Sequence, residues 1–356
     1  MGLSLPFFKR NELLGLDLGS NSVKLVQLSG GKHKWQLVKL GIAYLPPEAI
    51  VDGSIIDSMT VADTIRELVR EQGVSVKSVA SALTGHSVII KKVSLPVMTE
   101  DDLAESIQWE AEQYIPFPVS DVNIDFQILG EAAEVSGQMD VMLVAVKKDV
   151  INDYVNVIKD AGLEPAVIDV DSFALENMLE SNYNLEPNEN VAIVNVGASI
   201  TVLSILVGGI TVFTRAIPMG GNQFAEEIQK DLNISFKDAE SVKIGQAVDG
   251  VDGALVEPIM VRLADKLAVE IKRSVEFFLG GSAGHYVNKI FLSGGASRAQ
   301  GLSDTIQGRT AIPVEMINPF QNITCNEKNF DADYLKDMAP SFAVGMGLAM
   351  RQAGDK

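Results

Sequence analysis

The sequence predicts an α/β protein with two related lobes and a smaller module inserted into the first lobe. An apolar strand–turn–strand pattern at residues 13–28 returns at residues 191–216, which is a weak internal repeat. A β-α-β-β-α-β pattern over residues 86–166 interrupts the first half of the chain. The 356 residues, of which 47% are hydrophobic, suffice for two or more domains with their own cores.

Composition excludes several classes of function. The formal net charge of −18 argues against general nucleic-acid binding, because a phosphate backbone would be repelled, and it disfavours anionic membrane surfaces too. The single cysteine, Cys325, excludes an internal disulfide and a cysteine-rich metal site. The most apolar stretch, residues 191–213, is rich in Val, Ile and Thr and is broken by glycines, so we expect strands and a soluble protein.

The first lobe is expected to open with a hairpin whose turn lies at residues 19–22. A helix follows because Ile65, Leu68 and Val69 recur on one face. The expected elements are strands at 13–18, 23–28 and 34–44, a helix at 61–73, and a buried strand at 78–83.

The inserted module has clear helix boundaries. Thr99 is a predicted N-cap with acids in the turn that follows, where they suit the helix dipole. Pro116 and Pro118 end this first helix, and Gly162 ends the second. The expected strands are 88–95, 123–129 and 138–146, and the expected helices are 101–115 and 148–160.

The second lobe repeats the strand–turn–strand pattern and then becomes mostly helical. Gly197 and the pair at 208–209 separate its first three strands. The expected strands are 191–196, 201–207, 210–216 and 289–292, and the expected helices are 223–232, 239–245, 256–279, one opening near Gly301, and 343–351.

The first turn combines an acid, a glycine and two hydroxyls in a pattern that suits phosphate. Gly19 allows a ligand to approach the backbone closely, and successive turn N–H groups would hold phosphate oxygens. Ser20 and Ser22 add donors, and Lys24 is able to reach the same phosphates. Asp17 would repel bare phosphate, so it fits only with a divalent cation between them. The alternative is an ordinary β-turn built from residues with high turn propensity.

Two further glycine turns strengthen the phosphate-site hypothesis. The segment NVGASIT, residues 195–201, shares the frame of the first turn, so the two hairpins are expected to face each other across one phosphate chain. The segment FLSGGASRAQG, residues 291–301, is a strand that runs into a Gly-Gly turn and a helix, where backbone would lie flat against a base and a sugar. Taken alone, this last segment also fits an ordinary strand–helix loop.

These three turns, in this order, resemble the ATPase superfamily of actin, Hsp70 and the sugar kinases, which has a two-lobed, ribonuclease H-like fold. The resemblance implies an ATP or ADP site with Mg²⁺, in which Asp17 and, through water, Asn195 hold the metal. It also implies that Glu240 and Lys243 contact ribose and adenine, and that Asp169 orients water. The implied loops are phosphate-1 (Asp17, Gly19, Ser20, Asn21, Ser22, with Lys24), phosphate-2 (Asn195, Gly197, Ala198, Ser199, Thr201) and adenosine (Gly294, Gly295, Ala296).

A closer resemblance, over nearly the whole chain, is to the PilM family of type IV pilus assembly proteins. It is carried by SIQWEAEQYIPFP, VIDVDSFAL, SVEFFL and SFAVGMGLAMR. The inserted module stands where this family and the cell-division protein FtsA carry their extra subdomain. The expected domains are lobe 1 at 10–85, 167–190 and 338–353, the inserted subdomain at 86–166, and lobe 2 at 191–337.

This resemblance implies a cytoplasmic, ATP-binding scaffold of the pilus machine, peripheral at the inner membrane through its partners. The implied partners are the N-terminal cytoplasmic peptide of PilN, docked beside the inserted module, the assembly motor ATPase and the platform protein. One position departs from the family pattern, because Asn195 stands where an Asp is usual. The loss of a charge near Mg²⁺ predicts that nucleotide binding is more robust than hydrolysis. Alternatively, Asn195 only caps the turn and Asp17 holds the cation alone.

Two other functions remain as alternatives: an active ATPase or kinase of the superfamily, and a membrane filament like FtsA. No convincing base for a kinase is visible, and the tail MRQAGDK lacks the apolar face that a membrane helix needs. The P-loop, HExxH and GxSxG motifs are absent. His33, His86 and His285 are scattered, and we expect surface or hydrogen-bonded histidines rather than ligands.

Overall fold

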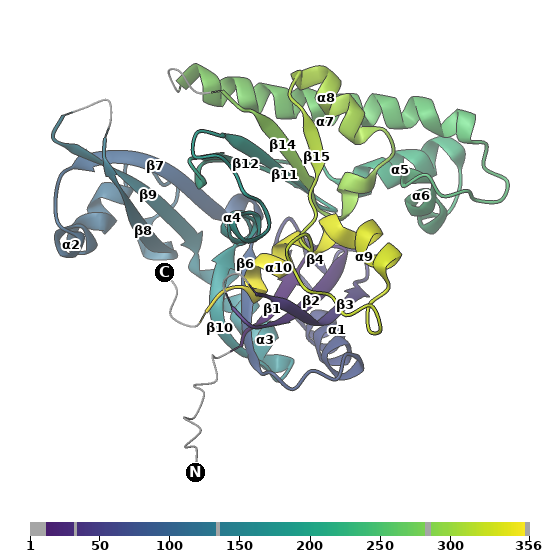
Figure 1. Ribbon diagram of the computed structural model, residues 1–356, viewed down its shortest axis with the longest axis horizontal. Helices are drawn as coiled ribbons and strands as arrows, with labels where there is room; N and C mark the ends of the chain where they lie inside the picture. The colour runs from purple at the N-terminus through teal and green to yellow at the C-terminus, as the bar shows by residue number, and fades with distance from the viewer. Residues whose placement is uncertain (1–11, 32–33, 133–135, 282–285, 353–356) are drawn as a thin grey trace, which may run out of the picture.

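The computed structural model describes residues 12–31, 34–132, 136–281 and 286–352 (Figure 1). His33 and His285, with residues 10, 11 and 353 of the predicted first lobe, lie outside this part of the chain. Within it, two five-stranded sheets form two lobes, and a three-stranded sheet forms a module at one side.

The two large sheets have the same topology, which confirms the internal repeat. In each, three antiparallel strands are followed by two strands parallel to the first. The order is β10-β6-β1-β2-β3 in lobe 1 and β13-β12-β11-β14-β15 in lobe 2. The lobe 1 strands are β1 (Leu14–Leu18), β2 (Ser22–Ser29), β3 (Gln36–Tyr44), β6 (Ser78–Leu83) and β10 (Glu164–Val170). The lobe 2 strands are β11 (Val191–Val196), β12 (Thr201–Val207), β13 (Ile210–Ile217), β14 (Lys289–Ser293) and β15 (Val314–Met316).

Helices cover both sheets and fill the space between them. Helices α1 (Ser58–Glu71) and α3 (Lys148–Asp160) cover the outer face of the lobe 1 sheet. Helices α4 (Asp171–Asn182) and α10 (Ala343–Ala349) lie between the two sheets. The outer face of the lobe 2 sheet carries α5 (Gly221–Leu232), α6 (Phe236–Lys243), α7 (Gly253–Gly281) and α8 (Leu302–Thr310).

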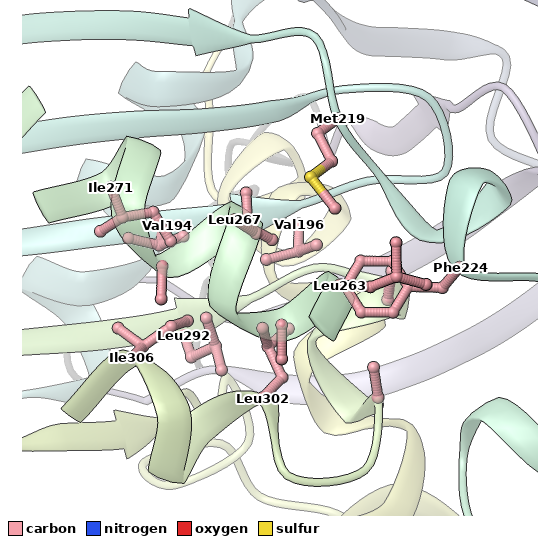
Figure 2. Close-up of a cluster of buried hydrophobic side chains, with 14 of the residues drawn as sticks. Val194, Val196, Met219, Phe224, Leu263, Leu267, Ile271, Leu292, Leu302 and Ile306 are labelled. Atoms are coloured by element: carbon pink, nitrogen blue, oxygen red, sulfur yellow. The ribbon is translucent and has the colours of Figure 1, made fainter. Parts of the chain in front are cut away.

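Figure 2 shows the lobe 2 core, where side chains of α7 and α8 meet those of the central strands. Val194 and Val196 of β11 are fully buried there, as are Leu267 of α7 and Ile306 of α8. Although α7 has 29 residues, no helix in the described ranges is both long and apolar enough to cross a bilayer.

The inserted module is an antiparallel sheet, β7-β9-β8, with α2 on one face. Its elements are β7 (Val88–Pro96), α2 (Glu100–Ala111), β8 (Val122–Glu131) and β9 (Gln138–Lys147). The predicted N-cap at Thr99 is confirmed, because its side chain accepts a hydrogen bond from Asp102 N at 3.2 Å.

The helix predicted at 148–160 exists, but it packs with lobe 1 rather than with the inserted sheet. Val150, Tyr154 and Val157 of this helix, α3, join the core that α1 and the lobe 1 sheet share. The reason is that β9 carries the chain back to lobe 1 before α3 begins, so the apolar face of α3 meets a different sheet.

Several bounds differ from the prediction: α2 ends at Ala111 rather than at the predicted 115, before Pro116 is reached, and α1 and α7 each begin three residues early. Helix α6 begins three residues earlier than the predicted 239, because Ser235 caps it by accepting a hydrogen bond from Asp238 N at 3.1 Å. The hairpin β4 (Ile50–Val51) and β5 (Ser54–Ile55), strand β15 and helix α9 (Ala332–Met338) were not predicted. Each spans seven residues or fewer, too few for periodicity to identify. Among the described residues there are also four short 3₁₀ segments: η1 (Gly85–Ser87), η2 (Val119–Asp121), η3 (Gly295–Arg298) and η4 (Ala339–Phe342).

Backbone contact between α10 and α4 joins the lobes. A Cβ on Gly347 of α10 would lie 1.7 Å from the carbonyl oxygen of Ala174 in α4. No side chain fits in that space, so this crossing of the two helices requires glycine at position 347.

We therefore expect Gly347→Ala to lower the free energy of unfolding by about 3 kcal/mol, because the two central helices must separate to admit the methyl group. Gly280→Ala in α7 is the matched control, since a Cβ there meets nothing within 4 Å. That control is expected to lose no stability, because alanine is the better helix former. Urea denaturation of both variants checks the prediction, and equal stabilities would contradict it.

Candidate functional site

A cavity of about 620 Å³ lies between the two lobes. All three glycine turns open into it, as the sequence predicts. The predicted binding residues that line it are Asp17, Gly19, Ser20, Asn21, Ser22, Lys24, Asn195, Gly197, Ala198, Ser199, Glu240, Lys243, Gly294, Gly295 and Ala296. Thr201 does not line it, because its hydroxyl donates to Met219 O at 2.7 Å inside lobe 2.

The hairpin of β1 and β2 places one positively charged and one negatively charged side chain in the cavity wall. Gly19 N donates to Ser22 O at 3.1 Å, which closes the turn. Asp17 and Lys24 are paired across the two strands, and Lys24 Nζ donates to Asp17 Oδ2 at 3.0 Å. Both side chains are less than one-fifth exposed, so each charge acts in a partly desolvated environment.

The β11–β12 turn has the same internal hydrogen bond as the first turn. Gly197 N donates to Ile200 O at 2.9 Å. The N-terminus of α5 packs onto this turn, because Gly221 N donates to Gly197 O at 2.9 Å and Asn222 N donates to Ala198 O at 2.8 Å. The start of α5 therefore fixes this turn, and both the turn and residues 221–222 line the cavity.

The third turn, at residues 294–296, packs closely against the end of β11, where the second turn begins. Gly294 has a φ of 89°, which favours glycine, and a Cβ there would lie 2.3 Å from Val196 O. Gly294 N donates to Pro340 O at 2.9 Å. The turn is thus fixed between β11 and η4, with Gly295 and Ala296 facing the cavity.

Lys243 connects α6 to the start of α5 at the cavity wall. It is 4% exposed, it is ion-paired with Glu240, and its Nζ donates to Gly221 O at 3.3 Å. Glu240 is one-third exposed, so it offers carboxylate oxygens to a ligand while it neutralises the buried lysine.

Asp169, the predicted catalytic acid, does not line the cavity. Its carboxylate accepts hydrogen bonds from Arg351 Nε at 2.6 Å and from Val170 N at 2.8 Å. Asp171, two residues later, lines the cavity instead. Asp169 lies one residue before the end of β10, whereas Asp171 is the first residue of α4 and was not among the predicted site residues.

Asp171 is a buried carboxyl group on the cavity wall. It is 6% exposed, and its Oδ2 accepts a hydrogen bond from Thr84 Oγ1 at 2.7 Å. Burial raises the pKa of Asp171 to about 6, and the charge of Asp17 adds to the increase. Asp17 and Asp171 thus place two carboxyl groups in a cavity that is also lined by backbone amides. This combination suits an anionic ligand that binds together with a cation.

The described residues contain no group of three or more His, Cys, Asp or Glu side chains arranged to hold a metal ion. A cation beside Asp17 would therefore depend on oxygens of a ligand and of water for most of its coordination. This donor set fits Mg²⁺ that arrives with phosphate, because Mg²⁺ usually keeps several waters and few protein ligands.

Residues at the mouth of the cavity were missed by the sequence analysis. Arg298 of η3 forms an ion pair with Asp337 of α9, and both line the cavity together with Tyr44. No motif marks them, because α9 is too short for periodicity and Arg298 follows the recognised turn.

A family model described as type IV pilus assembly protein PilM matches residues 15–353. A solved structure described as a PilM–PilN type IV pilus biogenesis complex is 30% identical, with a TM-score of 0.86, and the match covers 97% of this chain and 99% of that one. MreB5 of Spiroplasma citri bound to AMPPNP has a TM-score of 0.50 at 17% identity, covering 95% of each chain.

Cell division protein FtsA of Bacillus subtilis (strain 168) is 24% identical over 261 residues. The match covers 65% of this chain and 58% of FtsA, so the chain spans less than two-thirds of that relative. Together with the repeated sheets, these similarities identify the fold as a two-lobed, actin-like fold with an inserted subdomain.

The buried carboxyl of Asp171 predicts a pH-dependent effect of Asp171→Asn. The folded-state pKa of about 6 lies above the ordinary value of 3.8, so the folded state binds the proton more tightly. The ionised group therefore destabilises the fold as pH rises through this window, by about 3 kcal/mol above pH 7. Without nucleotide or Mg²⁺, Asp171→Asn should raise the free energy of unfolding at pH 7.5 and leave it nearly unchanged at pH 4. A difference that is the same at both pH values would contradict this.

Proposed function

Because the chain belongs to the PilM family of type IV pilus assembly proteins, we propose that it is an ATP-binding scaffold of the pilus assembly complex, located in the cytoplasm at the inner membrane. The observation that carries the proposal is the interlobe cavity, into which two hairpin turns of the same internal geometry open from opposite lobes. Such a pair of turns is suited to hold one polyphosphate from two sides.

The nucleotide is oriented by the three turns. Gly19 N and Gly197 N are used inside their own turns, so the amides that follow them, at residues 20–22 and 198–199, would bind the phosphates. Lys24 would exchange Asp17 for a phosphate oxygen. The Lys243–Glu240 pair would contact the ribose, and residues 294–296 would contact the base, because both sets line the cavity. Mg²⁺ would be held by Asp17, with Asn195 reached through water, and would neutralise phosphate charge near the two buried acids.

Hydrolysis is expected to be slow. Asn195 supplies no charge beside the metal, and Asp169 is held by Arg351 outside the cavity. Asp171 is the better candidate for the acid that orients water, since it lines the cavity wall. Binding without rapid turnover suits a scaffold, because the nucleotide then acts as a ligand that selects between lobe arrangements.

The docking place proposed for the N-terminal peptide of PilN is a second cavity of about 310 Å³ beside the inserted module. The similar PilM–PilN complex supports this partner. Apolar side chains of β7 and polar groups of η1 and β13 line the cavity, which suits a short peptide with apolar anchors. Its lining residues are Gly85, His86, Val88, Ile89, Ile90, Asp171, Ser172, Val202, Thr214, Arg215 and Ala216. Contacts with the motor ATPase and the platform protein complete the proposal.

The nucleotide proposal is tested by incubating the protein with ATP and Mg²⁺, denaturing it, and identifying what it retained. Retained ATP with little turnover supports the scaffold. Rapid turnover would favour an active ATPase, and the absence of nucleotide under all conditions would remove the site from the proposal.

Asp17→Asn is expected to weaken binding of AMPPNP at least tenfold in the presence of Mg²⁺, because the carboxylate that holds the cation is lost. In EDTA the variant should bind AMPPNP at least as tightly as the unmodified protein, because the charge that repels bare phosphate is gone. The control is Asp63→Asn, an exposed acid on α1 that pairs with Arg66. Calorimetric titration with and without Mg²⁺ distinguishes these cases, and an unchanged Mg²⁺-dependent affinity would refute the assignment of Asp17.

Ile90→Glu should weaken binding of a synthetic PilN N-terminal peptide at least tenfold, because it places a charge on an apolar wall of the second cavity. Val97→Glu is the matched control, since Val97 follows the far end of β7 and is already 58% exposed. Fluorescence anisotropy of the labelled peptide measures both. Equal affinities for the two variants would mean that the peptide docks elsewhere.

A further inference from the structure

The two cavities share a wall. Asp171 and Val202 line both the interlobe cavity of about 620 Å³ and the cavity of about 310 Å³ beside the inserted module. Asp171 is also the first residue of α4, the helix between the lobes. A ligand on either side of this wall is therefore next to the same carboxylate.

The chain enters the inserted module at this wall. Thr84 immediately precedes η1, which leads into β7, and Thr84 Oγ1 donates to Asp171 Oδ2 at 2.7 Å. Thr84 lines the interlobe cavity, whereas Gly85 lines the second cavity. A displacement of β7 therefore acts on a hydrogen bond to Asp171 through only a few backbone bonds.

The chain leaves the module close to the same place. Strand β9 continues directly into α3, where the fully buried Tyr154 donates its hydroxyl to Gly53 O at 3.1 Å. A Cβ on Gly53 would lie 2.6 Å from Thr84 O, and one on Gly85 would lie 2.8 Å from Asp52 O. The turn at 52–53 is thus packed against Thr84 on one side and held by α3 on the other.

Asp171 is also connected to lobe 2. Ser204 of β12 donates to Ser172 Oγ at 2.9 Å, and Ser172 Oγ in turn lies 3.4 Å from Asp171 Oδ1. The carboxylate is therefore hydrogen-bonded to Thr84, at the inserted module's first connection, and is linked to Ser204 of lobe 2 through Ser172. Because it is buried, its position is set by these few partners rather than by solvent.

We propose that the Thr84–Asp171 hydrogen bond couples occupancy of the cavity beside β7 to nucleotide binding between the lobes, so that each ligand strengthens the binding of the other. A peptide against β7 holds Thr84 in place, and Thr84 holds Asp171 in the orientation that receives the nucleotide and its cation. This inference rests on the proposed function. Linkage requires the two affinities to change by the same factor.

The test measures the affinity of Mg²⁺·AMPPNP with and without a saturating PilN N-terminal peptide, and the reciprocal affinity of the peptide. In the unmodified protein we expect an increase of about fivefold or more in each, within the usual range of allosteric coupling. In Thr84→Val this factor should fall to near one, whatever the variant does to either affinity alone. Thr64→Val, which removes a hydroxyl that bonds only within α1, should keep the full factor.

Tyr154→Phe provides a second variant that keeps the ring in the core and removes only the bond to the 52–53 turn. Its coupling factor should lie between those of the unmodified protein and Thr84→Val. If both ligands bind but the unmodified protein shows no coupling, or Thr84→Val keeps it, the inference is overturned and the proposed function stands. If either ligand fails to bind the unmodified protein, both are overturned.

Discussion

The backbone contact between α10 and α4 is the constraint on which the rest of the structure depends. Gly347 admits no side chain between these helices, so the two sheets lie on opposite sides of a thin shared layer. In this arrangement β1 and β11 both end at the space between the lobes, and the turns that follow these strands open into one cavity. A wider separation of α10 from α4 would move the two turns apart and enlarge the space that one phosphate chain has to span.

Because both lobes contribute to the cavity wall, its charged side chains lie close together. Each buried or partly buried lysine at the site is paired with an acid, Lys24 with Asp17 and Lys243 with Glu240. Asp171 has Thr84 and Ser172 as hydrogen-bond partners, and its charge remains close to that of Asp17. A polyphosphate alone would be repelled by this pair of acids, whereas a polyphosphate with a divalent cation relieves the repulsion between them. The same electrostatics explain how a protein with a net charge of −18 accommodates an anionic ligand.

The inserted module is more closely tied to this cavity than its position in the sequence indicates. Its core is its own, made by α2 against one face of β7-β9-β8. Its first connection nevertheless passes through Thr84, which is hydrogen-bonded to Asp171, and its second, α3, holds the 52–53 turn that packs against Thr84. The cavity beside β7 is therefore separated from the interlobe cavity only by a wall that contains Asp171, Val202 and the Thr84–Asp171 hydrogen bond.

Much of this architecture is contained in local patterns. Alternating apolar residues with Gly-rich turns were enough to predict both hairpins, the repeat and all three turns, because strand pairing across a short turn depends on neighbouring residues. Which of Asp169 and Asp171 lines the cavity could not be read from the local sequence. The two acids are two residues apart at the junction of β10 and α4, and Arg351, distant in the chain, binds Asp169. The packing of α3 with lobe 1 and the wall shared by the two cavities likewise depend on contacts between residues distant in the chain. Periodicity shows that a helix has an apolar face, but the surface that the face meets is set by where the whole chain folds back.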